Sequence, residues 1–259
     1  MTTPNIERAV IVTGASSGIG RAIAEQLGKA GFRLWLLGRS AEGLAATADS
    51  IKAAGGLAPH CEIIDIQEAG RLAGLVEKIG QTHPYLFALV NNAGVMHPES
   101  ILSGTPARWR AMFEINVLAP LEACRTAIEA MRRHGQPAHL INISSIAAQW
   151  EDGGVYGASK RALETISGTL RLELEHDDIR VATIAPGGFT TQLGRHLETE
   201  TIRKISASIR SKGIEPSATD KRLMGDPNYI AHAVLYILEQ PININIEKLV
   251  IRPPIDTRC

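Results

Sequence analysis

The chain has 259 residues, which is enough for one large α/β domain with a substantial core. Its 27 Lys and Arg residues balance 27 Asp and Glu residues, and only 4% of the residues are aromatic. A neutral chain with few aromatic side chains argues against a nucleic acid or a membrane surface as its partner.

Short runs rich in Val, Ile and Leu alternate with longer stretches of helical character along the chain. The apolar runs are not interrupted by polar residues, which predicts strands buried on both faces of a parallel sheet. The predicted strands are 9–13, 34–37, 63–64, 86–90, 140–143, 181–184 and 249–251. The predicted helices are 20–30, 41–54, 68–81, 109–133, 155–176 and 228–239. This order predicts a doubly wound α/β sheet in a single domain over residues 1–259.

A glycine-rich loop, TGASSGIG at residues 13–20, follows the first predicted strand and opens the first predicted helix. Glycines permit a tight turn and a close approach of the backbone to a pyrophosphate, which the helix N-terminus attracts. The loop lacks the G-K-[ST] ending of a P-loop, which argues against an ATPase or kinase. The alternative is an ordinary glycine-rich turn. The predicted phosphate-binding residues are Gly14, Ser16, Ser17, Gly18, Ile19 and Gly20.

The second predicted strand runs into Gly38-Arg39-Ser40 without a carboxylate. In dinucleotide-binding folds an acidic residue ~20 positions beyond the loop takes the ribose 2′-hydroxyl and selects NAD. Arg39 would instead make a charge-assisted contact to a 2′-phosphate, with Ser40 as a second donor. The pattern predicts NADP(H) as the cofactor, and the alternative is an exposed arginine that begins the next helix.

A tyrosine and a lysine, Tyr156 and Lys160, are four residues apart in a predicted helix and therefore share a face. A lysine beside a tyrosine favours the phenolate and lowers the pKa of the phenol, which suits proton transfer near neutral pH. The alternative is a solvated helix face.

Many apolar runs end in small or polar residues. In an open parallel sheet ligands bind outside the carboxyl ends of the strands, so these residues are expected to gather at one edge of the sheet.

Several further motifs accompany the glycine loop and the Tyr156–Lys160 pair. In chain order the motifs are T-G-x-x-x-G-I-G at 13–20, Asp65, N-N-A-G at 91–94, Asn116, Ser145, Y-x-x-x-K at 156–160 and P-G from 186. Taken in this order, they resemble the short-chain dehydrogenase/reductase family over nearly the whole chain. The resemblance implies a Rossmann-type sheet of about seven strands flanked by helices. It also implies an NADP-dependent oxidoreductase that interconverts a small-molecule alcohol and its ketone or aldehyde.

The resemblance also implies roles for individual residues. Tyr156 would be the general acid in reduction and the general base in oxidation, while Lys160 would lower its pKa and hydrogen-bond the nicotinamide ribose. Ser145 would hold the substrate oxygen, and Asn116 would hold a water that relays protons to Lys160. Further cofactor contacts would come from Asp65, Ile66, Asn92, Ala93, Gly94, Pro186, Gly187, Phe189 and Thr191.

The stretch before Tyr156 departs from the family pattern S-S-x-A-G, because Ala148 replaces the glycine. The interval to Tyr156 is 11 residues for Ser145 and 12 for Ser144. Ser145 is preferred, with the short spacing attributed to a trimmed loop at 149–152, and Ser144 stays open. Trp150 is either a wall of the substrate pocket or part of an oligomer interface. Met96 and His97 are further candidates for the pocket wall.

Residues 190–225 are polar and are expected to form a lid over the substrate, with Leu197, Ile202 and Ile205 on a weakly apolar helical face. The alternative is a surface insertion with no role in catalysis. By resemblance, the helices at 109–133 and 155–176 are expected to pair across subunits in a homo-tetramer or homo-dimer.

The three cysteines form no C-x-x-C, and no histidine spacing matches a metal site, so no metal or disulfide framework is expected. The N-terminus lacks a basic region followed by an apolar stretch, so no secretory signal and a cytoplasmic location are expected. Two other function classes stay open: a regulatory protein that binds NADP without turnover, and a lyase or isomerase on the same fold.

Overall fold

The protein contains one seven-stranded parallel sheet with the strand order β3-β2-β1-β4-β5-β6-β7. The computed structural model describes residues 8–191, 193, 199–217 and 219–255. The strands are β1 (Ala9–Thr13), β2 (Arg33–Gly38), β3 (His60–Ile63), β4 (Leu86–Asn91), β5 (Ala138–Ile143), β6 (Ile179–Pro186) and β7 (Lys248–Ile251). This sheet confirms the predicted fold class, and the strand order reverses direction between β1 and β4.

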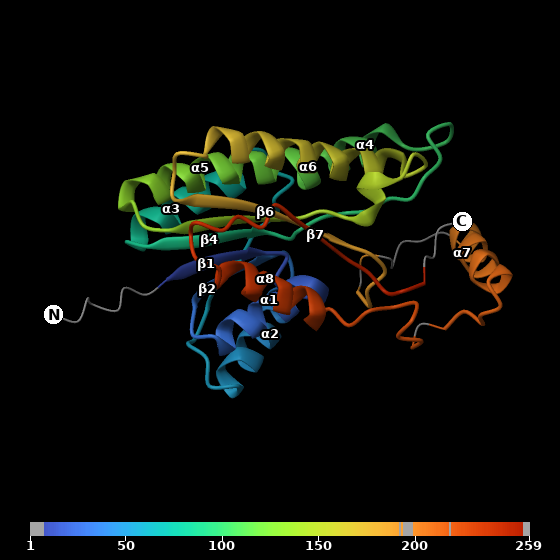
Figure 1. Ribbon diagram of the computed structural model, residues 1–259, viewed down its shortest axis with the longest axis horizontal. Helices are drawn as coiled ribbons and strands as arrows, with labels where there is room; N and C mark the ends of the chain where they lie inside the picture. The colour runs from blue at the N-terminus through green and yellow to red at the C-terminus, as the bar shows by residue number, and fades with distance from the viewer. Residues whose placement is uncertain (1–7, 192, 194–198, 218, 256–259) are drawn as a thin grey trace.

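Helices cover both faces of the sheet (Figure 1). One layer contains α3, α5 and α6, and the other contains α1, α2 and α8. The α-helices are α1 (Gly18–Lys29), α2 (Ala41–Ala53), α3 (Arg71–Thr82), α4 (Pro106–Phe113), α5 (Ala119–His134), α6 (Gly154–Glu173), α7 (Thr199–Ser211) and α8 (Asn228–Leu238). A 3₁₀ turn, η2 (Ile146–Gln149), lies between β5 and α6.

Each central strand contributes side chains to two hydrophobic cores, because successive side chains point to opposite faces of the sheet. In β1, Val10 and Val12 pack into the core below α1 and α8, whereas Ile11 packs into the core under α3 and α5. β2 repeats this division, with Leu34 and Leu36 in the first of these cores. The uninterrupted apolar runs of the sequence therefore mark strands that are covered twice.

The edge strand β3 differs from the prediction. It spans His60–Ile63 rather than 63–64, and Ile63 is 61% exposed. The other edge strand, β7, also carries exposed residues, including Val250. Because an edge strand has a neighbour on one side only and incomplete helical cover, the expectation of strands buried on both faces is wrong for these two.

The predicted helix 109–133 is also wrong in detail, because a π-helical turn, η1 (Glu114–Leu118), separates α4 from α5. The Ala119 N–H bonds to the Glu114 carbonyl, which is five residues earlier. Pro120 has no N–H to close an α-helical bond to the Asn116 carbonyl, so the local winding loosens there. The turn carries Asn116, one of the predicted site residues.

Part of the predicted lid lies outside the described residues, including Leu197 and the other residues of 194–198. The described part contains α7, on which Ile202 is 50% exposed and Ile209 is buried. Figure 1 shows α7 on the side of the molecule toward which the strands point. The role of this segment as a lid stays a prediction.

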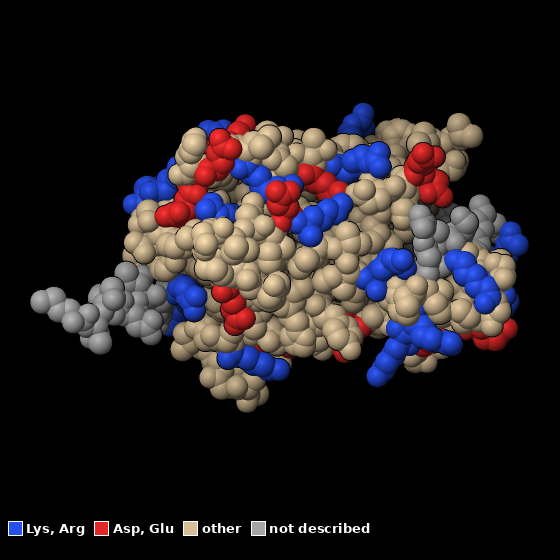
Figure 2. Space-filling model, in the orientation of Figure 1, with Lys and Arg blue, Asp and Glu red and all other residues tan. Residues whose placement is uncertain are grey.

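Figure 2 shows side chains of both charge signs interspersed over the visible face, in keeping with the neutral composition. Within the described ranges, no helix combines the length and the apolar character needed to cross a membrane. The same residues contain no group of three or more His, Cys, Asp and Glu side chains placed to hold a metal ion.

Candidate active site

The glycine loop between β1 and α1 needs its glycines for steric reasons. Gly14 and Gly18 have φ values of 68° and 55°, a region that side chains disfavour. A Cβ on Gly20 would lie 2.2 Å from the Gly14 carbonyl oxygen. Ser17 precedes α1 in an extended conformation and makes no side-chain capping bond. The loop thus presents closely packed backbone and the N-terminus of a helix, the arrangement that suits a pyrophosphate.

The N-N-A-G turn after β4 is bonded directly to the glycine loop. The buried Thr13 hydroxyl oxygen accepts hydrogen bonds from the backbone N–H groups of Asn92 and Ala93, both at 3.0 Å. The Asn92 amide in turn donates to the Thr13 carbonyl at 2.9 Å. These bonds join the carboxyl ends of β1 and β4, at the point where the strand order reverses and ligands bind in such sheets.

A cavity opens beside this junction, and we refer to it as the switch-point cavity. Six predicted cofactor residues line it: Gly14, Arg39, Asp65, Ile66, Ala93 and Gly94. The remaining lining residues are Thr13, Leu37, Gly38, Ile64, Val95 and Ile115. The walls are mainly apolar, with Asp65 and Arg39 as the charged groups. Such a lining suits a flat heterocycle with a charged group at its rim.

Arg39 and Ser40 are both exposed at the end of β2. The Ser40 hydroxyl oxygen accepts a hydrogen bond from the Gly43 N–H at 3.0 Å and thereby caps α2. Arg39 lines the cavity and its side chain is exposed to solvent, one residue before the cap of α2. Both the side chain and the helix end favour an anion at this position.

Tyr156 lies near the start of α6 with 8% of its surface exposed. Burial raises the pKa of its phenol, and hydrogen bonding to the Ser145 side chain partly opposes this rise. The expected lowering of the phenol pKa by Lys160 is therefore not found in this structure, because burial dominates. The phenol is held in its protonated form at neutral pH.

The two candidate serines point to different partners. The Ser144 hydroxyl donates to the Glu164 carboxylate at 2.9 Å, away from the phenol. The Ser145 oxygen caps η2 by accepting from the Ala147 N–H at 3.2 Å, and it is the serine that interacts with Tyr156. This arrangement favours Ser145.

Lys160 lies one turn after Tyr156 and is 4% exposed. Its ammonium donates to the Ile143 carbonyl at 2.8 Å, and burial lowers its pKa from 10.5 to about 8. A Cβ built on Gly94 would lie 3.3 Å from the Lys160 nitrogen and 3.1 Å from the Asn116 Oδ1. The N-N-A-G turn, the π turn and α6 thus meet around this lysine.

Asn116 is fully buried, and its side chain is bonded to backbone. Its Oδ1 accepts from the Val95 N–H, and its Nδ2 donates to the Val95 carbonyl, both at 2.9 Å. Nδ2 also donates to the Ser159 hydroxyl at 3.1 Å. We refer to Asn116, Ser145, Tyr156 and Lys160 as the Tyr156 cluster.

Comparison with known proteins assigns the family. A family model described as short chain dehydrogenase matches residues 8–201. The chain belongs to the short-chain dehydrogenase family. Dehydrogenase/reductase SDR family member 11 of Homo sapiens is 30% identical over 268 residues, covering 98% of this chain and 98% of the human protein.

Two further relatives carry more specific names. The rhamnolipids biosynthesis 3-oxoacyl-[acyl-carrier-protein] reductase of Pseudomonas aeruginosa is 34% identical over 212 residues, 78% of this chain and 81% of that protein. A metagenomic short-chain oxidoreductase solved in complex with NADP is 30% identical, with a TM-score of 0.76 over 97% of this chain and 99% of that chain.

The segment after β6 brings more of the predicted short-chain dehydrogenase residues to the site. β6 ends at Pro186, and the next residue, Gly187, donates to the Ile251 carbonyl at 2.8 Å. A Cβ on Gly18 would lie 3.3 Å from the Thr191 Cβ, so Thr191 packs over the glycine loop. The Phe189 side chain, by contrast, is buried in the core, which leaves its backbone as the part that can border a ligand.

Apolar side chains pack around the phenol, and of these only Met96 and Trp150 are predicted from the sequence. Tyr156 packs in one cluster with Met112 and Ala147, against which Trp150 and Met96 also pack. Val95, Trp109 and Val155 complete this cluster. Met112 and Trp109 lie in the helix before the π turn, so their proximity to Tyr156 depends on tertiary packing that no local sequence signal reports. The assignment of His97 to the pocket wall stays a prediction.

Proposed function

We propose that this chain is an NADP(H)-dependent oxidoreductase that interconverts a small-molecule alcohol and its ketone or aldehyde. One observation carries the proposal: a buried tyrosine that interacts with a serine lies one helical turn from a buried lysine, beside the N-N-A-G turn. This combination of groups suits proton transfer to a substrate oxygen. A regulatory protein that only binds NADP has no use for a buried phenol and ammonium together.

The choice of NADP(H) over NAD(H) rests on the end of β2. Arg39 is exposed at the rim of the switch-point cavity, and the strand runs directly into Gly38-Arg39-Ser40 without a carboxylate. The glycine loop and the cavity suit a pyrophosphate and an adenosine, and Arg39 suits an additional phosphate on the ribose. The NADP complex of the metagenomic relative supports this choice.

In the proposed reaction the cofactor, when bound, supplies or accepts the hydride. During reduction, negative charge develops on the substrate oxygen, and the Tyr156 phenol and the Ser145 hydroxyl stabilise it in the transition state. Tyr156 donates its proton to this oxygen. The raised pKa keeps the phenol protonated beforehand, and the proton returns to Tyr156 during oxidation. Lys160 and Asn116 hold the polar surroundings of the phenol in place.

A panel assay tests the proposal. Purified protein is mixed with NADPH or NADH and a set of aliphatic, aromatic and 3-oxoacyl ketones and aldehydes, and absorbance at 340 nm is followed. We expect steady NADPH consumption with at least one carbonyl compound and a lower kcat/KM with NADH. NADPH binding without consumption across the panel would support the regulatory function instead. Equal or higher efficiency with NADH would contradict the cofactor assignment.

A further inference from the structure

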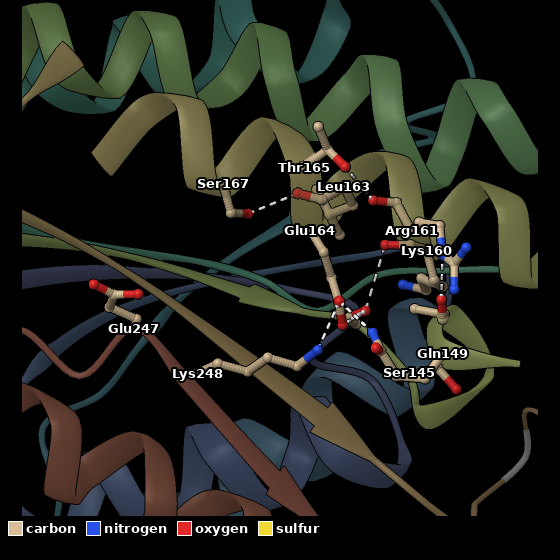
Figure 3. A network of polar contacts seen from close by, with 12 residues as sticks. Ser145, Gln149, Lys160, Arg161, Leu163, Glu164, Thr165, Ser167, Glu247 and Lys248 are labelled. Carbon is tan, nitrogen blue, oxygen red and sulfur yellow. Dashed lines mark hydrogen bonds and ion pairs between the residues drawn. The ribbon is translucent and has the colours of Figure 1, made fainter. Parts of the chain in front are cut away.

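Glu164, which lies outside the predicted site, connects three segments around the Tyr156 cluster (Figure 3). It is on α6, one turn after Lys160, and its side chain is 15% exposed. Its Oε1 accepts from the Ser144 hydroxyl at 2.9 Å. Its Oε2 accepts from the Gln149 amide and from the Lys248 ammonium, both at 2.7 Å. The three donors come from the end of β5, from η2 and from β7.

This carboxylate is not a solvated surface charge. Removing a carboxylate from water is unfavourable unless donors replace the lost water, and here three donors do so. Glu247 shows the contrast: its side chain is 71% exposed, and its nearest cation, the Arg171 Nε, is 4.0 Å away. The position of Glu164 is therefore fixed by its neighbours, and Glu164 in turn fixes them.

The segment held in this way contains Ser145. Ser144 lies immediately before it and Gln149 ends the η2 turn, so Glu164 binds both ends of residues 144–149. Tyr156 and Glu164 belong to the same helix. Glu164 therefore connects both ends of the segment that contains Ser145 to the helix that carries Tyr156. In this way it fixes the position of the Ser145 hydroxyl relative to the phenol.

We propose that Glu164 is a positioning residue for the reaction, which acts by holding Ser145 against Tyr156. The inference rests on the proposed function, since it assigns a purpose to the Ser145–Tyr156 contact. Without the carboxylate, the 144–149 segment loses its two bonds to Glu164. It keeps the bond from the Arg161 Nε of α6 to the Ala148 carbonyl at 2.7 Å and the longer contact of Ser144 with the Lys160 carbonyl at 3.5 Å, so the serine shifts relative to the phenol while the segment stays attached to α6. Displacements of about 1 Å in such sites lower turnover by up to ~100-fold. NADPH binding is retained, because the glycine loop and Arg39 lie on other elements.

The first test compares Glu164→Ala with two controls on β7 and next to it. We expect kcat to fall roughly tenfold to a hundredfold in Glu164→Ala, with the NADPH Kd within about twofold of wild type. Lys248→Met removes one donor and leaves Ser144 and Gln149 bound, so a smaller loss of kcat is expected. Glu247→Ala removes a neighbouring exposed carboxylate and should leave kcat unchanged. Unchanged kcat in Glu164→Ala would overturn the inference.

A conservative variant separates positioning from folding. Glu164→Gln keeps a carbonyl oxygen that accepts from Ser144, and its NH2 group can donate to the Gln149 carbonyl oxygen once the Gln149 amide turns over. It loses the charge that binds Lys248. We expect it to recover most of the kcat lost in Glu164→Ala, while the two variants have similar melting temperatures. If kcat instead follows the melting temperature across Glu164→Ala, Glu164→Gln and Lys248→Met, the residue stabilises the fold and does not position Ser145.

The decisive experiment repeats Glu164→Ala in a Ser145→Ala background, with the carbonyl compound that NADPH reduces fastest in the panel. If Glu164 acts through Ser145, its removal costs little further kcat once the serine hydroxyl is gone. An equal fold-loss in both backgrounds overturns the inference and leaves the proposed function standing. A Ser145→Ala variant with wild-type kcat would instead overturn the role of Ser145 in the proposed function, and the positioning role with it.

Discussion

The switch-point cavity and the Tyr156 cluster lie at the same edge of the sheet but are built differently. The cavity is formed by backbone turns and apolar walls, and the charge at its rim is the exposed side chain of Arg39. In the Tyr156 cluster, Asn116, Tyr156 and Lys160 are buried and Ser145 is half-buried, and these polar side chains bond to backbone and to one another. Arg39 contributes through its charge, whereas the members of the cluster contribute through their positions.

This difference has a consequence for mutation. An exposed side chain at a rim can be replaced without disturbing the fold, so a change there alters ligand affinity alone. A buried polar group leaves its partners unsatisfied when it is removed, and its neighbours in one network respond together. The two regions should therefore separate cofactor choice from turnover in experiments.

The largest effect is expected for Tyr156→Phe. The variant keeps the ring that packs with Met112 and Ala147 but lacks the proton donor, so turnover should fall roughly a hundredfold or more. Steady-state kcat at saturating NADPH measures this loss. Tyr229→Phe removes a phenol from an exposed position on α8 and serves as the matched control with unchanged kcat.

A smaller loss is expected for Ser145→Ala, roughly tenfold to a hundredfold in kcat, because one donor to the developing negative charge disappears. Ser144→Ala should lose less, since that hydroxyl bonds Glu164 and not the phenol. Parallel kcat measurements on the two variants decide between them. A larger loss for Ser144→Ala would reverse the assignment of the serine.

Arg39→Asp should alter the cavity and leave the cluster intact. We expect kcat/KM for NADPH to fall at least roughly tenfold, as for loss of a charge-assisted contact, with the melting temperature unchanged. Lys52→Asp makes the same change in charge at an exposed position in the last turn of α2 and should have no effect on kcat/KM. Full NADPH use by Arg39→Asp would exclude Arg39 as the phosphate contact.

The smallest effect concerns stability and pH. Burial lowers the pKa of Lys160 to about 8, so between pH 8 and 10.5 the unfolded state binds the proton that the folded state has released. The free energy of unfolding from this group should therefore rise with pH, by about 1.5 kcal/mol from pH 8 to 9.5. Burial raises the pKa of the Cys124 thiol to about 12, which affects both proteins alike, so the rise is measured by urea unfolding as the difference between the wild type and Lys160→Met. Parallel pH profiles would disprove the shift.

The elements that local sequence determines were predicted best. The predicted strand 9–13 coincides with β1, because its uninterrupted apolar run is buried on both faces and the glycine loop marks its end. The glycine loop itself depends on backbone sterics that a sequence displays directly. The π turn was missed, although Pro120 in the middle of a predicted helix was a visible signal for it.

Features that depend on contacts between distant segments could not be predicted from the sequence. The direction of Ser144 and Ser145 depends on how the 144–149 segment meets α6, and Glu164 reaches Lys248, which is 84 residues away in the chain. The pKa of Tyr156 also escaped prediction, because the sequence places a lysine nearby but gives no measure of how deeply the phenol is buried. In each case the deciding contact lies between distant segments.

The most direct test of the account measures NADPH binding and turnover on the same Tyr156→Phe protein. NADPH fluorescence titration should give a Kd within about twofold of wild type, while kcat with the best carbonyl compound falls roughly a hundredfold or more. This result would mean that the Tyr156 cluster moves the proton and that the switch-point cavity and glycine loop hold the cofactor. Near-normal turnover in this variant would contradict the account.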